Sequence, residues 1–533
     1  MLNTSYKKCM WHFINESNNG NDLTLSHTTQ SYKNFNINTP VRWSNLKCLL
    51  LAAFLSIVML FTLTSCETGV PKLSKNKPVN IVIWHHYLGE QKVSFDNLVE
   101  EFNNTVGAGS GITVKAYSMD NTGDIHTKLL SAANHEPGST EFPQMATAYP
   151  STAYTLYKLD KLVPLEKYMS EKELDEYIPS FIDEGKLTSD SGTMIFPIAK
   201  STEIMYINYT FFKQFLDEYN SSNPPTKLTE DMLYTFEGIQ QIAAAYYDWT
   251  DSKTPEIPND GKALYGCDAA SNFAIITYKQ LGDDFFIVNS DNTGDIDLHS
   301  PAMRTCWDSY YAPMVKGYYG AYSFYRSEDV QTGDLLMYTG STAGASFFPN
   351  TVTYSDNTKH DVELKSLPYP SFSNGKKVTV QQGAGVILAK STPEKEYASV
   401  LFLKWLTEPE RNIDFVLKTG YFPVSIKAQE MLENMLSEDE LSGLNENIVK
   451  VIETTLKMMQ THEFYTYKPF EASDEIRYSF EDKLLSFTTI SRNEFLESLA
   501  ESNDFSACVD KYITDQRYDQ FLTEVRHEVL KAK

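Results

Sequence analysis

The sequence predicts an α/β fold, because strand–helix–strand units stand both early and late in the chain. A short apolar run at 80–84 suits a buried parallel strand. Apolar residues then recur at i, i+3, i+4 and i+7 over 95–102, which is one face of a helix, and a second apolar strand follows at 112–116. A strand at 385–389 followed by a helical stripe over 398–405 makes a similar late unit. Such units predict sheets covered by helices.

Residues 1–65 have the features of a signal or leader segment that precedes the fold. The stretch 48–63 is almost wholly apolar, and Arg42 and Lys47 stand just before it. Its sixteen residues are short for a membrane span, which needs about 20. Leu63-Thr-Ser-Cys66 then matches the bacterial lipobox, in which the cysteine is acylated and becomes the new N-terminus. We therefore expect a lipid anchor at Cys66, followed by a polar tether over 66–78.

Further along the chain, local signals mark the other elements. A glycine-rich break at 107–111 is expected to end the first helix, and a strand is expected at 143–148. Ser391 and Glu394 have capping-box spacing before a helix, and Gly420 fits a helix end. The region 425–533 is mostly helical in pattern, with almost no proline or glycine.

Composition and charge exclude several classes of function. The 533 residues are 42% hydrophobic and 22% charged, which is typical of a globular protein with two or more cores. The net charge of −24 repels phosphate backbones, so nucleic acid is not expected as a partner. Aromatic residues make up 13% of the chain, which is unusually high.

No catalytic or metal-binding motif is found in the sequence. The segment 340–344 looks like a nucleophile elbow, but Thr342 stands at its centre instead of serine. His85 and His86 are neighbours at a strand end and point to opposite faces, so a shared metal is not expected. Nothing singles out two carboxylates as a glycosidase pair. We therefore expect no catalytic residue, no metal and no cofactor.

Five segments in the same order along the chain resemble one family. Residues 79–103 resemble the mature start of extracellular solute-binding proteins of the maltose-binding type, and 197–208 resembles that family's crossing between lobes. The segments 333–341, 381–385 and 419–424 complete the series, and the last is similar to the glycerol-3-phosphate-binding branch. One departure is the family's tryptophan after Pro225, which is missing here.

The resemblance implies a two-lobed periplasmic-binding-protein-like (type II) fold with discontinuous lobes and a helical C-terminal region. The implied first lobe holds 79–200 and 384–419, and the second holds 201–383 and 420–533. Crossings are expected near 200–205, 380–385 and 419–424. The ligand would lie in the cleft, where parallel sheets commonly bind their ligands beyond the strand ends.

Candidate ligand contacts combine flat aromatic faces with polar groups and exposed backbone, as sugar sites need. They are Trp84, Tyr87, Tyr149, Ser201, Thr202, Asp268, Asn272, Gly340, Ser341, Gly383, Ala384, Gly385, Tyr421 and Arg477. Each has an alternative structural role: the aromatics could be core, Asp268 and Asn272 helix caps, and the glycines tight turns. Tyr421 and Arg477 match positions used by the glycerol-phosphate branch.

The resemblance implies a lipid-anchored ABC-importer component in the bacterial cell envelope, facing the periplasm or the exterior, that binds a sugar for the membrane permease. Alternatives are a glycerol-3-phosphate or glycerophosphodiester ligand, a protein that feeds a sensor kinase, and a secreted glycoside hydrolase lipoprotein. A phosphate ester needs cations, for which Lys200, Arg326 and Arg477 are candidates. A neutral sugar is preferred, because it suits the aromatics Trp84, Tyr87, Tyr149, Trp307, Tyr322 and Tyr421.

Overall fold

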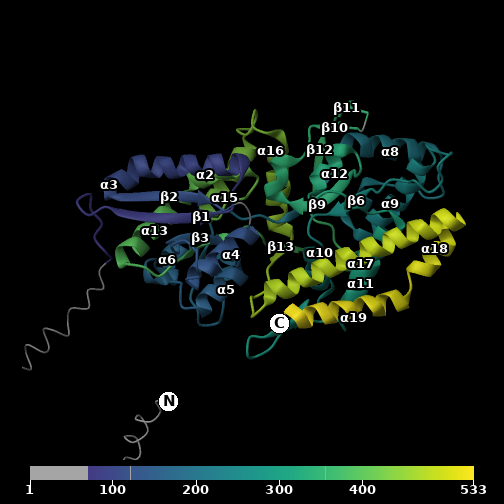
Figure 1. Cartoon of the computed structure of the whole chain (residues 1–533). Coiled ribbons are helices and arrows are strands. Elements are labelled where there is room, and N and C mark those ends of the chain that lie inside the picture. The colour runs from purple at the N-terminus through teal and green to yellow at the C-terminus, as the bar shows by residue number, and fades with distance from the viewer. Residues whose placement is uncertain (1–69, 120–121, 355, 533) are drawn as a thin grey trace, which may run out of the picture. The chain divides into compact units, whose positions relative to one another are not determined.

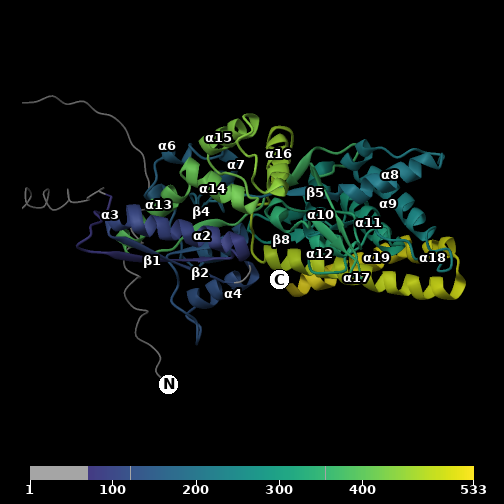
Figure 2. The ribbon, with the colours of Figure 1, turned by 90° about the horizontal axis from the view of Figure 1, so that it is seen from above.

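The structure is a computed structural model that describes residues 70–119, 122–354 and 356–532. The predicted leader and the lipidation site at Cys66 lie outside these residues. Residues 70–533 form one compact unit, and within it two sheets lie in separate halves of the view (Figures 1 and 2). The predicted α/β class is therefore confirmed.

The first lobe is built on a five-stranded sheet in the order β2-β1-β3-β14-β4. Its strands are β1 (Val79–His85), β2 (Ile112–Ser118), β3 (Met145–Ala148), β4 (Ile195–Phe196) and β14 (Gly385–Leu388). Strand β1 pairs in parallel with β2 and β3, and β14 is antiparallel to β3 and β4. A strand that arrives late in the chain thus completes a sheet begun at its start.

Helices flank this sheet, and α2, α13 and α14 supply apolar residues to its core. The helices of this half are α2 (Gly89–Phe102), α3 (Ala108–Ser110), α4 (Thr122–Ala133), α5 (Pro150–Lys158), α6 (Glu171–Leu174), α7 (Pro179–Glu184), α13 (Pro393–Leu406) and α14 (Pro409–Thr419), with shorter turns at η1 (Asn103–Gly107) and η2 (Leu165–Lys167). On α2, Phe95, Leu98, Val99 and Phe102 are all buried, as their spacing predicts.

The glycine-rich break at 107–111 ends the helical run, as expected, but only at its last glycine. Helical turns continue from α2 through η1 and α3, and they stop only at Gly111, whose φ is +74°. Position 107 within this run requires glycine, because a Cβ there would stand 2.7 Å from the carbonyl oxygen of Ile112. The glycine thus allows close packing against β2 without breaking the helix.

The second lobe is built on a four-stranded sheet in the order β12-β5-β9-β6. Its strands are β5 (Glu203–Asn208), β6 (Tyr265–Cys267), β9 (Met337–Ser341) and β12 (Leu364–Leu367). Strand β5 is antiparallel to both neighbours, and β6 runs parallel to β9. The small two-stranded pairs are β7 (Phe286–Val288) with β8 (Gly294–Ile296), β10 (Thr351–Thr353) with β11 (Lys359–Asp361), and β13 (Val378–Val380) with β15 (Glu463–Tyr465).

A large helical layer packs around this second sheet. It consists of α8 (Tyr209–Ser221), α9 (Phe236–Asp251), α10 (Ala270–Leu281), α11 (Pro301–Lys316), α12 (Arg326–Thr332), α16 (Glu446–Thr461), α17 (Ser473–Ser502), α18 (Phe505–Tyr512) and α19 (Asp515–Ala532), with turns η3 (Glu230–Tyr234) and η4 (Thr342–Phe347). Helix α15 (Ile426–Ser437) instead packs against α14. Helices α17 and α19 run side by side in both views (Figures 1 and 2). The predicted helical C-terminal region is confirmed. The described part contains no helix that is both long and apolar enough to cross a membrane.

Three chain segments lie side by side between the two sheets. Lys200 and Phe422 exchange backbone hydrogen bonds of 2.8 and 3.2 Å, and Ser201 and Gln382 exchange bonds of 2.8 and 3.0 Å. The chain passes here from β4 to β5 and, later, from β13 to β14. These segments coincide with the crossings named above, while the exact division of residues between lobes stays a prediction.

Candidate ligand-binding site

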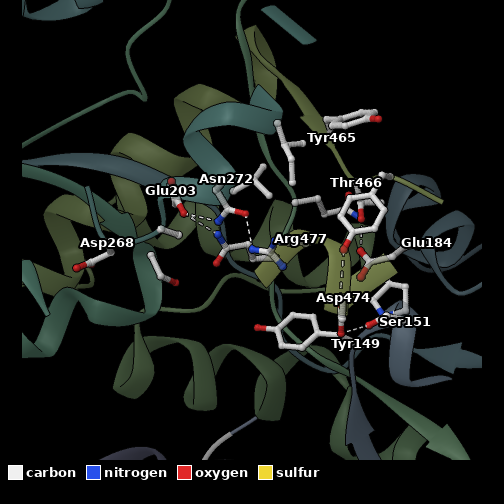
Figure 3. Close-up of a pocket in the computed structure, with 18 of the residues that line it drawn as sticks. Tyr149, Ser151, Glu184, Glu203, Asp268, Asn272, Tyr465, Thr466, Asp474 and Arg477 are labelled. Carbon is white, nitrogen blue, oxygen red and sulfur yellow. Dashed lines mark hydrogen bonds between the residues drawn. The ribbon is translucent and has the colours of Figure 1, made fainter. Parts of the chain in front are cut away.

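A cavity of about 360 Å³ opens beside the crossing segments. The first lobe supplies its wall with β3–α5 and α7, and the second lobe with β5, the β6–α10 turn, β9 and α17. The lining residues are Tyr149, Pro150, Ser151, Glu184, Glu203, Asp268, Ala269, Asn272, Ile275, Tyr325, Ser341, Val380, Gln381, Gln382, Tyr465, Thr466, Tyr467, Asp474, Arg477 and Tyr478. Carboxylates, amides and tyrosines therefore dominate its wall (Figure 3).

The topology explains why polar groups gather here. Strand β3 ends just before Tyr149, where Pro150 starts α5, and β6 ends just before Asp268, where α10 follows. Ser341 is the last residue of β9. Strand ends and helix starts leave backbone and side-chain polar groups free of the sheet, which is where open α/β sheets bind ligands.

Arg477 and Glu203 are joined through an amide relay in the middle of the cavity wall (Figure 3). The Arg477 Nη2 group donates to Asn272 Oδ1 at 2.7 Å, and Asn272 Nδ2 donates to Glu203 Oε1 at 2.5 Å. Gln382 Nε2 donates to the same oxygen at 2.9 Å. Glu203 Oε2 is buried and has no hydrogen-bond partner among the residues that the structure describes. The relay fixes the carboxylate in place and leaves one oxygen unsatisfied.

Burial raises the pKa of Glu203 from 4.5 to about 7, because a charged carboxylate loses its water there. The nearby Asp268 raises the pKa further, while the hydrogen bonds from Asn272 and Gln382 and the charge of Arg477 lower it. Asp268 itself is exposed to the cavity, and its Oδ1 accepts the backbone N–H of Arg326 at 2.8 Å. Gly340 makes room for Asp268, since a Cβ at Gly340 would stand 2.3 Å from Asp268 Oδ2.

A buried ion pair lies where the cavity meets the crossings. Lys200 Nζ contacts both oxygens of Glu184 at 2.8 and 2.9 Å and also donates to the carbonyl of Gly383 at 2.6 Å. Gln381 Nε2 donates to Glu184 as well. Lys200 is 2% exposed and Glu184 is 6% exposed, so this pair belongs to the interior.

Asp474 links the two lobes across the cavity. Its Oδ2 accepts the hydroxyl of Ser151 from α5, and its Oδ1 accepts the hydroxyl of Tyr467 at 3.3 Å (Figure 3). Tyr149 stands next to Ser151, and burial raises its pKa to about 12, so its phenol is neutral at pH 7 and can donate a hydrogen bond. The cavity therefore offers neutral phenols, carboxylate acceptors and one guanidinium.

The structure brings together five of the predicted ligand contacts and sets the others apart. Those that line the cavity are Tyr149, Asp268, Asn272, Ser341 and Arg477. Their contact with a ligand stays a prediction.

The remaining predicted residues are used by the fold. Trp84 packs in the core, and the rings of Tyr87 and Tyr421 meet edge to face at 6.1 Å in an aromatic cluster. Ser201 pairs through its backbone, and the Thr202 hydroxyl donates to the carbonyl of Val380 at 2.6 Å. The small residues Gly340, Gly383, Ala384 and Gly385 lie outside the lining. Gly383 and Gly385 allow other backbone segments to approach closely, Gly340 makes room for side chains, and Ala384 is buried.

The other aromatic and cationic residues named as candidates from the sequence also lie outside the cavity lining. Trp307 is buried and stacks on Tyr311 at 3.7 Å. Arg326 is buried beside Asp329, 3.2 Å away, and Tyr322 is 61% exposed without lining the cavity. Among the described residues, no group of three or more His, Cys, Asp or Glu side chains is arranged to hold a metal ion.

Several residues that line the cavity were not predicted from the sequence. They include Glu184, Glu203, Asp474, Tyr325, Tyr465, Tyr467 and Tyr478. One signal was available for Glu203, because it is a charged residue at the start of an otherwise apolar strand, β5. The tyrosines of 465–478 come from the C-terminal region, whose helical pattern gave no hint that it reaches the cavity.

A polar cavity between two α/β lobes, beside the segments that connect them, is the arrangement of a periplasmic-binding type of protein. The sequence profile described as bacterial extracellular solute-binding protein matches residues 97–441. This is more than half of the chain, and the chain therefore belongs to that family. A comparison with curated protein sequences found no match.

Solved structures share the fold at low sequence identity. A cyclic alpha-maltosyl-1,6-maltose binding protein from Arthrobacter globiformis is 16% identical with a TM-score of 0.56, covering 84% of this chain and 99% of its own. UgpB from Mycobacterium tuberculosis, solved with glycerophosphocholine, is 15% identical with a TM-score of 0.57, covering 82% and 100%. A maltotriose binding protein from Thermus thermophilus is 14% identical with a TM-score of 0.53, covering 84% and 100%.

Proposed function

We propose that this protein is the lipid-anchored, extracytoplasmic substrate-binding component of an ABC importer, and that it binds a sugar in the cavity and delivers it to a permease. One observation carries the proposal: residues of both lobes, including five tyrosines, four carboxylates and Arg477, converge on one cavity in a solute-binding family member. Solved proteins of the same fold are described as binding cyclic maltosyl-maltose or maltotriose.

The chemistry of the wall suits a sugar. Tyrosine rings offer flat apolar faces to the C–H side of a sugar ring, and their hydroxyls remain available for hydrogen bonds. Glu203 and Asp268 accept from ligand hydroxyls, and Arg477 and Asn272 donate to ligand oxygens. Tyr149 comes from the first lobe, while the other four come from the second.

Ligand contacts from both lobes would favour a closed form. A ligand that touches Tyr149 and Arg477 at once gains more contact when the lobes approach, so it shifts the population toward closure. The crossing segments at 200–201, 382 and 422 would serve as the hinge.

A glycerol-3-phosphate or glycerophosphodiester ligand is the second candidate, and Arg477 is the observation that favours it. A solved protein of the same fold was crystallised with glycerophosphocholine. Arg477 is, however, the one cation among the residues that line the cavity, where the carboxylates other than the Lys200-paired Glu184 would repel a phosphate. A sugar is therefore preferred. A secreted glycoside hydrolase stays the alternative from another class.

Calorimetric titration of the full chain, purified in detergent, tests the ligand class. The panel holds neutral oligosaccharides, glycerol-3-phosphate and glycerophosphocholine. We expect saturable binding of a sugar without time-dependent product, and a loss of affinity of about tenfold or more in Asp268→Asn. The exposed Asp190→Asn is the matched control. Phosphate-ester binding without sugar binding would refute the sugar proposal, and product formation would favour a hydrolase.

The proposed anchor has its own test. Cys66→Ala should accumulate an unprocessed precursor in the membrane fraction, because lipobox processing needs the thiol. Mass spectrometry of the N-terminus and metabolic labelling with a fatty acid report the modification. Normal processing of Cys66→Ala would contradict the anchor. Neighbouring genes for permeases would support import, whereas a sensor kinase gene would support signalling.

A further inference from the structure

The charge of the cavity is strongly unbalanced. Four carboxylates line it, from Glu184, Glu203, Asp268 and Asp474, against the single guanidinium of Arg477. Lys200 neutralises Glu184 through its 2.8 Å contact. Three carboxyl groups and one cation then remain, and Glu203, whose pKa is about 7, is only partly ionised at pH 7. The net charge of −24 adds to the negative potential.

The Arg477 guanidinium donates hydrogen bonds to two neutral side chains. Its Nε donates to Ser271 Oγ at 3.1 Å, and its Nη2 donates to Asn272 Oδ1 at 2.7 Å. Behind it, Ser271 Oγ donates to Glu481 Oε2 at 2.9 Å, so a further carboxylate lies near the guanidinium. Arg477 therefore reaches Glu203 only through the Asn272 amide, and within the described part of the chain no cation forms a salt bridge with Glu203.

The wall contains buried acceptors that lack donors. Glu203 is 2% exposed and its Oε2 has no hydrogen-bond partner. Gln381 is 5% exposed, and its Oε1 also has no partner. Both residues line the cavity. A buried acceptor oxygen without a donor costs free energy, so these two oxygens remain unsatisfied until a group with N–H or O–H donors enters the cavity.

The surrounding rings are also suited to a cation. Tyr149, Tyr325, Tyr465 and Tyr478 line the same cavity, and the negative face of a tyrosine ring attracts an ammonium group. The Arg477 guanidinium already lies 5.4 Å from the ring centre of Tyr478. Carboxylates and tyrosines together therefore favour a ligand that has both hydroxyl groups and a positive charge.

We propose that the ligand is an amino sugar whose ammonium group lies beside Glu203 and Asp268. The inference rests on the proposed sugar-binding function and specifies the class of sugar. The sugar ring lies against the tyrosines, and the ammonium supplies the donors that Glu203 Oε2 lacks. Phosphate esters are disfavoured by the same carboxylates.

The ammonium also changes the protonation of the site. Burial and the charge of Asp268 raise the pKa of Glu203. The hydrogen bonds from Asn272 and Gln382 and the charge of Arg477 lower it. The Cys267 thiol and the Tyr369 phenol lie close enough to interact as well. Since the Glu203 pKa is about 7 in the free protein, a bound cation lowers it and expels a proton near pH 7. Proton release on binding is thus a signature of this arrangement.

A matched pair of ligands tests the inference. Oligomers of glucosamine and of N-acetylglucosamine share one skeleton and differ in the charge of the amino group. Titration of the full chain in detergent should give an affinity at least about tenfold higher for the amine, with weaker binding at high salt. Calorimetry in two buffers of different ionisation enthalpy should reveal protons released at pH 7.

Variants locate the effect. Glu203→Gln is isosteric, and it should reduce the ratio of amine affinity to acetamide affinity about tenfold. Asp268→Asn should reduce the same ratio by a similar factor, and it provides a second test if Glu203→Gln does not fold. Glu100→Gln removes an exposed charge from α2 and should leave the ratio unchanged. Melting curves verify folding of each variant.

The outcomes separate the inference from the function on which it rests. Equal affinities, or a preference for the acetamide or other neutral sugars, would overturn the amino-sugar assignment and leave sugar binding intact. Binding of no sugar in either series would overturn the proposed function as well. An unchanged ratio in both Glu203→Gln and Asp268→Asn would remove these carboxylates from the site.

Discussion

At the residue scale, the Lys200–Glu184 pair shows how charge is used in the interior. Each partner is at least nine-tenths buried, and Lys200 also holds the Gly383 carbonyl. Burying two charges brings little net stability over an apolar pair, but removing one partner leaves the other without compensation. The pair therefore fixes the geometry of the crossings beside the cavity.

We expect Lys200→Met to lower the free energy of unfolding by about 3–5 kcal/mol, because Glu184 keeps its burial but loses its cation. Urea denaturation measures the change. Lys457→Met removes an exposed lysine that pairs with Glu453 and should have little effect. Equal effects of the two variants would show that the buried pair has no special structural role.

Glu203 predicts a pH dependence of stability with a defined sign. Its pKa is raised from 4.5 to about 7 in the folded protein, so folding binds a proton between these pH values. The contribution of Glu203 to the free energy of unfolding is fully present below about pH 4.5 and is lost as the pH rises through 7. Relative to wild type, Glu203→Gln should gain on the order of 2–3 kcal/mol between pH 5 and pH 8.

Urea denaturation of both proteins at the two pH values measures this gain. Comparing variant with wild type cancels the titration of the histidines, which both proteins share. Glu100→Gln, an exposed site, should show no such change. If the difference between Glu203→Gln and wild type were the same at pH 5 and pH 8, the raised pKa would be contradicted.

At the scale of elements, the crossing segments pack backbone against backbone. Gly383 has a φ of +89°, and a Cβ there would stand 2.7 Å from the Ala199 carbonyl oxygen and 2.8 Å from Lys200 Cα. Glycine is thus required both for the backbone conformation and for the close approach of two crossings.

Gly383→Ala should therefore destabilise the protein more than a glycine replacement that adds only backbone strain. Gly138 has the same φ of +89° with open space around it, so Gly138→Ala serves as the control. We expect about 1–2 kcal/mol for Gly138→Ala and at least about 2 kcal/mol more for Gly383→Ala, measured by urea denaturation. Equal losses would mean that the crossings tolerate a methyl group.

Elements with a clear period were predictable from the sequence. The apolar run at 80–84 and the stripe over 95–102 became β1 and α2, and Gly420 ends α14 with a φ of +74°. Local signals were less exact: the helix α13 is capped by Thr392, whose hydroxyl accepts the N–H of Lys395, and not by the expected Ser391. Cap motifs overlap here, and tertiary packing selects one.

The site was only partly predictable, because residues that are far apart in the sequence come together only in the folded protein. Tyr149 and Asp268 follow strands and Ser341 ends one, so their positions at strand ends made them predictable. Glu184 and Asp474 line the same cavity from α7 and α17, which no local pattern connects. Trp84 and Tyr421 show the opposite problem: an aromatic ring near a strand or turn serves the core as readily as a ligand.

At the scale of the whole described unit, the cavity couples the lobes. Asp474 of the second lobe accepts a hydrogen bond from Ser151 of the first, and Lys468 Nζ contacts Asp183 Oδ2 at 3.1 Å. These contacts lie close to the crossings, so small rotations of the lobes would change the cavity wall. Ligand binding is therefore expected to raise the melting temperature by mass action and to compact the protein in solution.

The most direct test of the central claim is a crystal structure of the protein with its tightest-binding sugar. We predict ligand density inside the cavity, in contact with Tyr149 of the first lobe and with Asp268 and Arg477 of the second. Density for the sugar at another place on the protein, with the cavity holding only water, would contradict the account.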